Sequence, residues 1–211
     1  MPSTLVFPDG VRLAGEDELP GPEPRRSADW ARIQSASIAA GFVLTRSDDE
    51  RFTHYAELNV DAPRLWALFC NLCCDVLGPA ATLVIGHIDE EPVPIGAARV
   101  SSVLAILEPH KYQLAHDGLL QFGLVSTGDS TINEVFVAPT KHVKIWLNDQ
   151  ERFRSVMEQH ELRQVDRLEF LDEYPRATVA LPIDKVAFHD VGELLTHLEN
   201  EIAAMSDGGT T

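Results

Sequence analysis

The segment INEVFVAPTKHVKIWL, residues 132–147, decides the fold class of this 211-residue chain. Apolar and polar residues alternate in both of its halves, which is the pattern of two half-buried strands joined by a short turn. The two apolar sets share one core face only if Val137 lies opposite Val143 and Val135 lies opposite Ile145. The segment therefore predicts an antiparallel hairpin with residues 139–141 as its loop, and hence a largely antiparallel sheet.

The same register brings the remaining side chains of the hairpin together on its second face. Glu134 then lies opposite Trp146, and Phe136 lies opposite Lys144. Aromatic residues of this kind are common in interface hot spots, whereas a helix or the N-terminal segment packed over this face would leave the same pattern with no binding role. Two of the chain's four lysines fall here, so the segment is a locally positive region of an acidic protein. The candidate binding residues are Glu134, Phe136, Lys141, His142, Lys144 and Trp146.

The flanking sequence adds helices to this sheet. Asp61, Pro63 and Gly78 bracket an apolar stretch in the way that an N-cap, a first-turn proline and a C-terminal glycine bracket a helix. Strand-like patterns occur at 52–60, 80–88, 119–127, 165–174 and 177–181, and residues 89–96 resemble a loop. We expect a single α+β domain over residues 27–205, with a mostly antiparallel sheet packed by helices near 61–77, 150–160 and 191–205.

The two ends of the sequence have a different composition. Residues 1–26 are rich in proline, glycine and glutamate, which predicts a partly flexible N-terminal extension. A helix is expected from Ser27 to the residues before Gly41. The last six residues, 206–211, are expected to be a disordered tail.

The cysteines of the chain, Cys70, Cys73 and Cys74, all lie within the helix expected at 61–77. A Cys-x-x-Cys unit suggests a metal site or a redox pair. A zinc site needs about four ligands and no second ligand pair is present, while a redox pair usually opens a helix instead of lying inside one. We therefore expect core packing, with Cys73 buried, Cys70 beside Trp66, and Cys74 the most exposed of the three.

The formal net charge is −16, with eight histidines counted as neutral. Such a chain repels phosphate backbones and anionic lipids, which argues against nucleic-acid and membrane partners and favours a basic protein partner. The first residues lack the pattern of a signal peptide, and no apolar run reaches the roughly 18 residues of a membrane span. We expect a cytoplasmic protein with reduced thiols.

Two acidic segments follow predicted strands and are the main sign of enzyme chemistry. They could hold a divalent cation or act as an acid–base pair, although acidic loops are also common in any acidic protein. The common motifs for phosphate loops, dinucleotide binding, zinc proteases and serine hydrolases are absent, and no cofactor is expected. The acidic residues concerned are Asp89, Glu90, Glu91, Asp172 and Glu173.

The sequence thus leaves two hypotheses of different kinds. The favoured one is an acidic protein-binding module, of the inhibitor or immunity type, that masks a basic partner, because complementary charge speeds association. The alternative is a small enzyme, or a ligand or metal binder, that uses the carboxylates at the strand ends. We expect a binding protein more than an enzyme.

Overall fold

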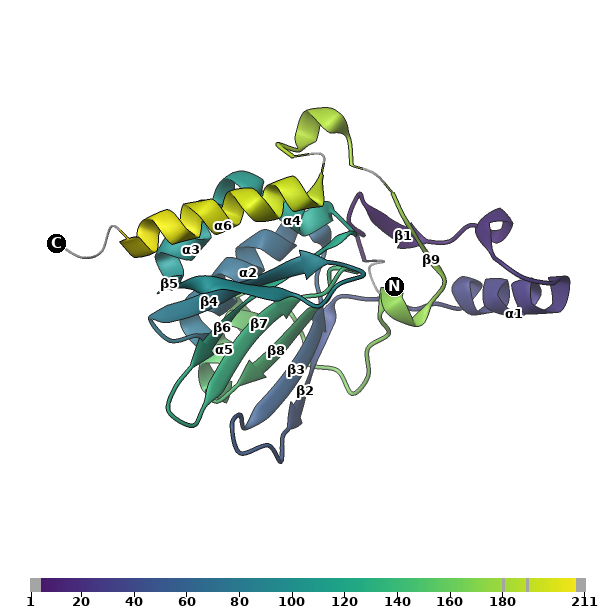
Figure 1. The fold of residues 1–211 in the computed structure, drawn as a ribbon. Coiled ribbons are helices and arrows are strands. Elements are labelled where there is room, and N and C mark those ends of the chain that lie inside the picture. Colours follow the sequence, from purple (N-terminus) through teal and green to yellow (C-terminus); the bar gives the residue numbers. More distant parts are fainter. Residues whose placement is uncertain (1–4, 180, 189, 208–211) are drawn as a thin grey trace.

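A computed structural model of the chain describes residues 5–179, 181–188 and 190–207 (Figure 1). Its main element is a seven-stranded sheet in the order β2-β3-β8-β7-β6-β4-β5, in which every neighbouring pair is antiparallel. The fold is therefore α+β, as the hairpin pattern predicts. The strands are β2 (Gly41–Arg46), β3 (His54–Asn59), β4 (Ala80–His87), β5 (Val93–Arg99), β6 (Leu120–Thr127), β7 (Ile132–Val137) and β8 (Val143–Leu147).

The predicted register of the central hairpin is confirmed. Val137 pairs with Val143, and Val135 pairs with Ile145. These side chains and Leu147 are fully buried on one face of the sheet. The alternation of side chains along a strand then sends the intervening residues to the opposite face.

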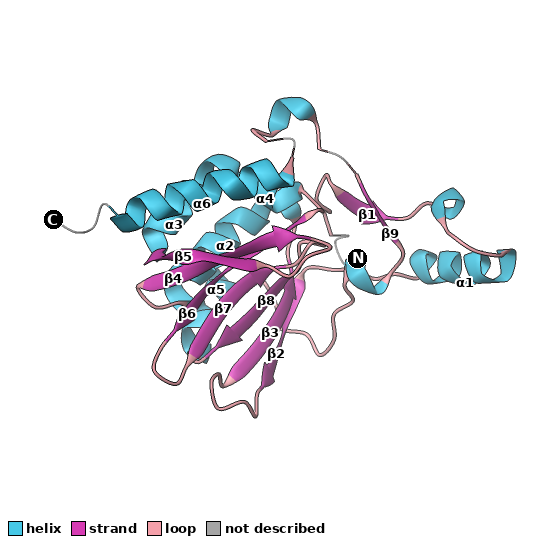
Figure 2. Ribbon diagram, viewed as in Figure 1, coloured by secondary structure: helices cyan, strands magenta, loops and turns pink. Residues whose placement is uncertain are grey.

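Helices cover the apolar face of the sheet. The layer consists of α2 (Ala62–Val76), α3 (Val100–Leu107), α4 (Lys111–His116) and α5 (Gln150–Gln159). Figure 2 shows α2 and α5 behind the sheet, while the other face of β7 and β8 is turned away from them. A further helix, α6 (Val191–Asp207), lies along β5 and α3 and buries Leu194, Leu198 and Ile202.

Aspartate residues precede three of the helices and cap two of them. Asp149 caps α5 by accepting hydrogen bonds from two backbone N–H groups, and Asp190 does the same for α6. Asp61 precedes α2 as predicted, but its carboxylate accepts from the backbone N–H of Val6 instead of capping the helix. The start of α2 therefore also anchors the N-terminal segment.

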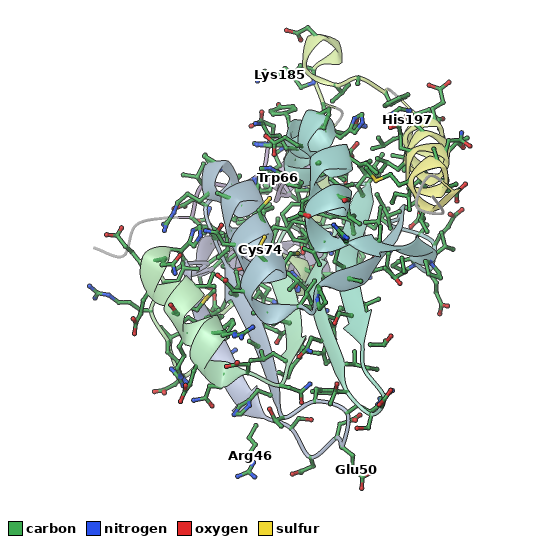
Figure 3. All side chains as sticks on the ribbon, turned by 90° about the vertical axis from the view of Figure 1, so that its left-hand side faces the viewer. Arg46, Glu50, Trp66, Cys74, Lys185 and His197 are labelled. Carbon is green, nitrogen blue, oxygen red and sulfur yellow. The ribbon has the colours of Figure 1, made fainter. Side chains whose placement is uncertain are left out.

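The predicted burial of Cys73 and exposure of Cys74 are confirmed. Cys73 is buried in the core, Cys70 is half-buried and Cys74 is exposed. Figure 3 shows Trp66 and Cys74 on the ribbon of α2, in the helical layer. All three thiols are free, so this Cys-x-x-Cys unit forms no disulfide in the structure.

Several local predictions were wrong. The first helix is α1 (Glu23–Gln34), and residues from Gly41 form strand β2. Gly41 has a φ of +155°, and a Cβ there would lie 3.1 Å from the carbonyl oxygen of Arg163. Gly41 is thus the first residue of a strand, whereas the sequence pattern predicts that it ends a helix.

The segment 89–96 is only partly a loop, since β5 (Val93–Arg99) begins inside it. Pro94 is accommodated because β5 is at the edge of the sheet, where a missing N–H leaves no neighbouring strand unpaired. Residues 165–174 do not form a strand either. They contain a short 3₁₀ turn, η3 (Leu171–Glu173), and Leu171 is buried there by packing.

The segment expected to be an extension contains β1 (Val11–Leu13), which pairs with β9 (Arg176–Thr178) in a separate two-stranded sheet. Flexibility of residues 1–26 stays a prediction. At the other end, α6 continues to Asp207, so the expected tail begins as helix, and residues 208–211 lie outside the described residues.

Asp9 fastens this N-terminal segment to α4. Its carboxylate accepts a hydrogen bond of 2.5 Å from the hydroxyl of Tyr112 and lies 3.6 Å from the ammonium of Lys185. The backbone N–H of Asp9 donates to Nδ1 of His116. The hydrogen bond from Tyr112 is the main cause that lowers the pKa of Asp9. These contacts of Asp9 therefore have a structural role: they hold the N-terminal segment against α4.

Within the described parts of the chain, no helix combines the length and the apolar composition needed to cross a bilayer.

Candidate binding groove on the uncovered sheet face

The face of the sheet that the helices leave uncovered carries a groove of about 390 Å³. Side chains from β3, β4, β7 and β8 and from the turn between β4 and β5 form its walls. The residues that line it are Tyr55, Val84, Pro92, Glu134, Phe136, Lys144 and Trp146. Four of the six hairpin residues proposed from the sequence therefore meet in one place.

Two glycines shape this groove. Gly123 of β6 faces it without a side chain, and a Cβ there would lie 2.9 Å from Cδ2 of Phe136 and 2.6 Å from the carbonyl oxygen of Val135. Gly86 of β4 allows Pro92 to fold back, because a Cβ would lie 2.9 Å from its Cα. A Cβ atom at either position would lie too close to these atoms. Phe136 and Pro92 can therefore occupy their places in the groove wall only because residues 123 and 86 are glycines.

Trp146 lies at the centre of the aromatic wall. It pairs across β3 and β8 with Tyr55, and the two ring centroids are 5.2 Å apart at an interplanar angle of 50°. On its other side Trp146 pairs with Glu134 across β7 and β8, as the register predicts. The carboxylate of Glu134 therefore sits on the strand next to an aromatic pair.

Glu134 is half-buried, and burial alone raises the pKa of its carboxyl group. Among the residues that the structure describes, no hydrogen bond or ion pair reaches this carboxylate. Desolvation without a partner is unfavourable for a charged group. Glu134 is thus a half-buried carboxylate that has no hydrogen-bond or ion-pair partner among the described residues.

The Tyr55 end of the groove is acidic. Burial is the largest cause that raises the pKa of Tyr55, and the neighbouring carboxylates of Glu57 and Asp172 raise it further. Lys144 is the one lining cation, and it pairs in register with Glu57 and Phe136, although no carboxylate of the described residues lies within 4.0 Å of its ammonium. Acidic groups therefore outnumber basic ones around the groove.

Lys141 does not belong to this exposed surface. Only 4% of the residue is exposed, and its Nζ donates a 2.7 Å hydrogen bond to the carbonyl oxygen of Leu120. Its backbone lies in the left-handed region, with a φ of 64°, which turns the side chain inward from the hairpin loop. Burial lowers the pKa of Lys141 to about 7.

His142 is also buried, at 3% exposed. Its Nδ1 lies 2.9 Å from the hydroxyl of Thr140, and its ring centroid lies 4.8 Å from that of Phe170. Burial lowers its pKa to about 4, so the ring is neutral at pH 7. With Lys141 and His142 covered, the positive region expected from the sequence is reduced on the surface to Lys144.

The two acidic segments are placed differently. Asp172 lies within electrostatic reach of Tyr55 and His142, at the end of the groove. Glu173 instead accepts the backbone N–H of Phe170, closing its own turn. Its backbone oxygen accepts from Arg32.

The second acidic segment lies in the turn between β4 and β5. There the backbone oxygen of Glu90 accepts from Gln121, and the backbone N–H of Asp89 donates to His87; Glu91 precedes the groove residue Pro92. Among the described residues, no group of three or more His, Cys, Asp and Glu side chains could hold a metal ion. The structure thus assembles no metal-binding carboxylate cluster in the described ranges.

Three lining residues were missed from the sequence. Tyr55 could have been found, because its alternation with Glu57 was visible and only the pairing of β3 with β8 was lacking. Val84 and Pro92 gave no usable signal, and the position of Pro92 depends on its close approach to Gly86.

Comparisons with protein-family models, with curated proteins and with solved structures found no match to this chain.

Proposed function

We propose that this chain is a binding protein that masks a basic protein partner, in the manner of an inhibitor or immunity-type protein. The single observation that supports this most is Glu134, a half-buried carboxylate without a partner in the described structure. It lies beside aromatic rings on a sheet face that none of the described helices covers. A partner that brings a positive group to this face would satisfy the carboxylate and bury the rings.

The charge of the whole molecule supports the same conclusion. A net charge of −16 raises the rate at which a basic protein reaches the surface and disfavours acidic competitors. The carboxylates of Glu57, Glu134 and Asp172 around the groove place part of this charge at the proposed contact. Association should therefore weaken as salt screens the charges.

The groove also has the composition of an interface centre. Trp and Tyr are enriched among residues whose truncation costs the most binding energy, and such residues cluster in desolvated pockets. Tyr55, Phe136 and Trp146 provide this cluster. The charged residues that line the groove with them are Glu134 and Lys144. We keep the cytoplasm as the proposed location, because all three thiols are free.

The test is a paired affinity experiment. The wild-type chain, Trp146→Ala and the control Glu50→Gln are immobilised, and extracts of the source cells are passed over them at low and raised salt. We expect a basic protein that the wild type and Glu50→Gln retain at about 50 mM salt, that roughly 300 mM salt releases, and that Trp146→Ala does not retain.

The retained protein is then purified and its Kd and activity are measured with and without this chain. Direct binding with inhibition of the partner supports the proposal. The proposal is abandoned if no basic protein is retained at low salt, or if Trp146→Ala and the wild type retain it equally.

The second candidate is a small-ligand site in the same groove. Its volume of about 390 Å³ falls within the range of small-molecule pockets, and a carboxyl group with a raised pKa is common at ligand and catalytic sites. A thermal-shift screen of small organic cations and divalent ions tests it. A ligand that raises Tm in the wild type but not in Trp146→Ala would favour this candidate.

A further inference from the structure

We infer that the groove takes an arginine side chain of the partner, with its guanidinium against Trp146 and its N–H groups on the carboxylate of Glu134. The inference rests on the proposed function for the presence of a basic partner, and it names the chemistry by which that partner is recognised.

The first step is the need for a cation. Glu134 lies across the strand pair from Trp146 and has no hydrogen bond or ion pair among the described residues. A neutral polar ligand would satisfy part of this demand, whereas a cationic donor also restores the charge balance. The acidic character of the Tyr55 end, near Glu57 and Asp172, favours a cation again.

The second step is the choice of guanidinium over ammonium. Apart from Lys144, the residues that line the groove with Glu134 are apolar or aromatic, and they include the rings of Trp146, Tyr55 and Phe136. A guanidinium is planar and weakly hydrated, stacks on aromatic faces and can bind a carboxylate through two N–H groups. An ammonium is more strongly hydrated and would lose more on entering this groove.

The third step is that Lys144 leaves the position free. Its register partners are Phe136 on β7 and Glu57 on β3, and no carboxylate of the described residues lies within ion-pair distance of its ammonium. Glu134 pairs with Trp146 instead. The volume of about 390 Å³ is large enough for one side chain.

The experiment uses N-acetyl-arginine N-methylamide as the probe, and NMR spectra of the ¹⁵N-labelled full chain as the readout. The neutral citrulline analogue and the lysine analogue are the matched ligands. The indole N–H signals of the three tryptophans are separate reporters, and Trp146→Phe identifies the one in the groove.

We expect the arginine probe to shift the Trp146 indole signal and the amide signals of β7 and β8. The citrulline analogue should cause no saturable shift, and the lysine analogue should bind at least threefold more weakly. Glu134→Gln, which keeps the shape of the side chain, should weaken binding of the arginine probe at least fivefold. The control Glu50→Gln, in the loop between β2 and β3, should leave binding unchanged.

The inference is overturned if citrulline shifts the same signals as strongly as arginine, if Glu134→Gln binds like the wild type, or if the shifts lie away from the groove. Its failure is distinct from that of the proposed function. A basic protein that still binds in a salt-sensitive way would leave the proposed function standing without an arginine anchor. Arginine binding in the groove with no basic partner in extracts would do the reverse.

Discussion

The two faces of the central hairpin are made by the same two strands and yet have opposite properties, since residues alternate between the faces. On the helix-covered face, Val135, Val143 and Ile145 are fully buried. On the uncovered face, Glu134 and Trp146 remain half-buried and line a groove. One face therefore packs against the helices as part of the core, whereas the other face lines the groove.

The largest effect should come from opening a cavity on the covered face. Ile145→Ala removes a fully buried side chain between the sheet and its helices, and we expect a loss of about 2–5 kcal/mol in the free energy of unfolding. Urea unfolding followed by circular dichroism measures it. The adjacent Lys144→Ala on the uncovered face should cost no more than about 0.5 kcal/mol. Similar losses for the two variants would contradict the division between the faces.

The next largest effect is the pH dependence of stability that Lys141 should cause, because the hairpin loop buries its side chain. Burial lowers its pKa to about 7 in the folded chain, against 10.5 ordinarily, so between these values the unfolded chain binds a proton that the folded chain lacks. Stability should therefore rise with pH across this window, by at most about 1.4 kcal/mol per pH unit.

Lys141→Met should remove this rise, and Lys144→Met should not. Unfolding free energies of the three proteins at pH 7 and pH 9 measure the difference. If the Lys141 variant and the wild type show the same pH dependence, the ammonium of Lys141 is not desolvated in solution.

Glu134 should give a smaller effect of opposite sign. Its raised pKa means that the folded chain holds the proton more tightly than the unfolded chain, so its contribution to stability is present at low pH and is lost as pH rises through the folded pKa. Glu134→Gln should therefore be more stable than the wild type at pH 7, by about 0.5 kcal/mol, because the half-exposed group is partly screened.

The advantage of Glu134→Gln should shrink at pH 4, where the wild-type carboxyl group is protonated. Thermal unfolding at the two pH values measures it, with Glu50→Gln as the exposed control. A destabilised Glu134→Gln at pH 7 would mean that the carboxylate already has a partner within the folded chain.

The smallest effect concerns the rates at which the three thiols of α2 react, not stability. These thiols show the same contrast between a covered and an uncovered side. Cys73 faces the core, while Cys74 faces solvent and Cys70 lies between these extremes. Burial raises the pKa of Cys70 to about 12, so the fraction of this thiol that is present as reactive thiolate is very small at neutral pH. In the native protein a thiol reagent should label Cys74 first and Cys70 more slowly, and Cys73 only after unfolding. Rapid labelling of all three would show that α2 is not seated on the sheet.

Much of the fold could be predicted because its signals are local. The alternation in residues 132–147 defined both strands and their register, and Asp61, Pro63 and Gly78 marked α2. Some failures are positions where a distant contact decides. Arg163 approaches Gly41 at the start of β2. Residues 165–174 form no strand; Val165 donates a backbone hydrogen bond to Phe42, and Leu171 packs with Val11 and Ile38.

The candidate site was predictable to a similar degree. Glu134, Phe136, Lys144 and Trp146 share a face by simple alternation, so the register alone brought them together. The same alternation predicts His142 on this face, and proximity in sequence adds Lys141 to it. Their burial follows from a left-handed loop residue and from the segment carrying Phe170, neither of which leaves a periodic pattern.

The sequence by itself determined the antiparallel hairpin, its two chemically different faces, the buried helix with its cysteines and the acidic charge of the molecule, because these depend on periodicity and composition. Only the tertiary structure decided which face stays uncovered, that Tyr55 joins Trp146, and that glycines at 86 and 123 let Pro92 and Phe136 wall a groove around Glu134. Those features arise from contacts between residues far apart in the chain, which leave no periodic pattern in the sequence.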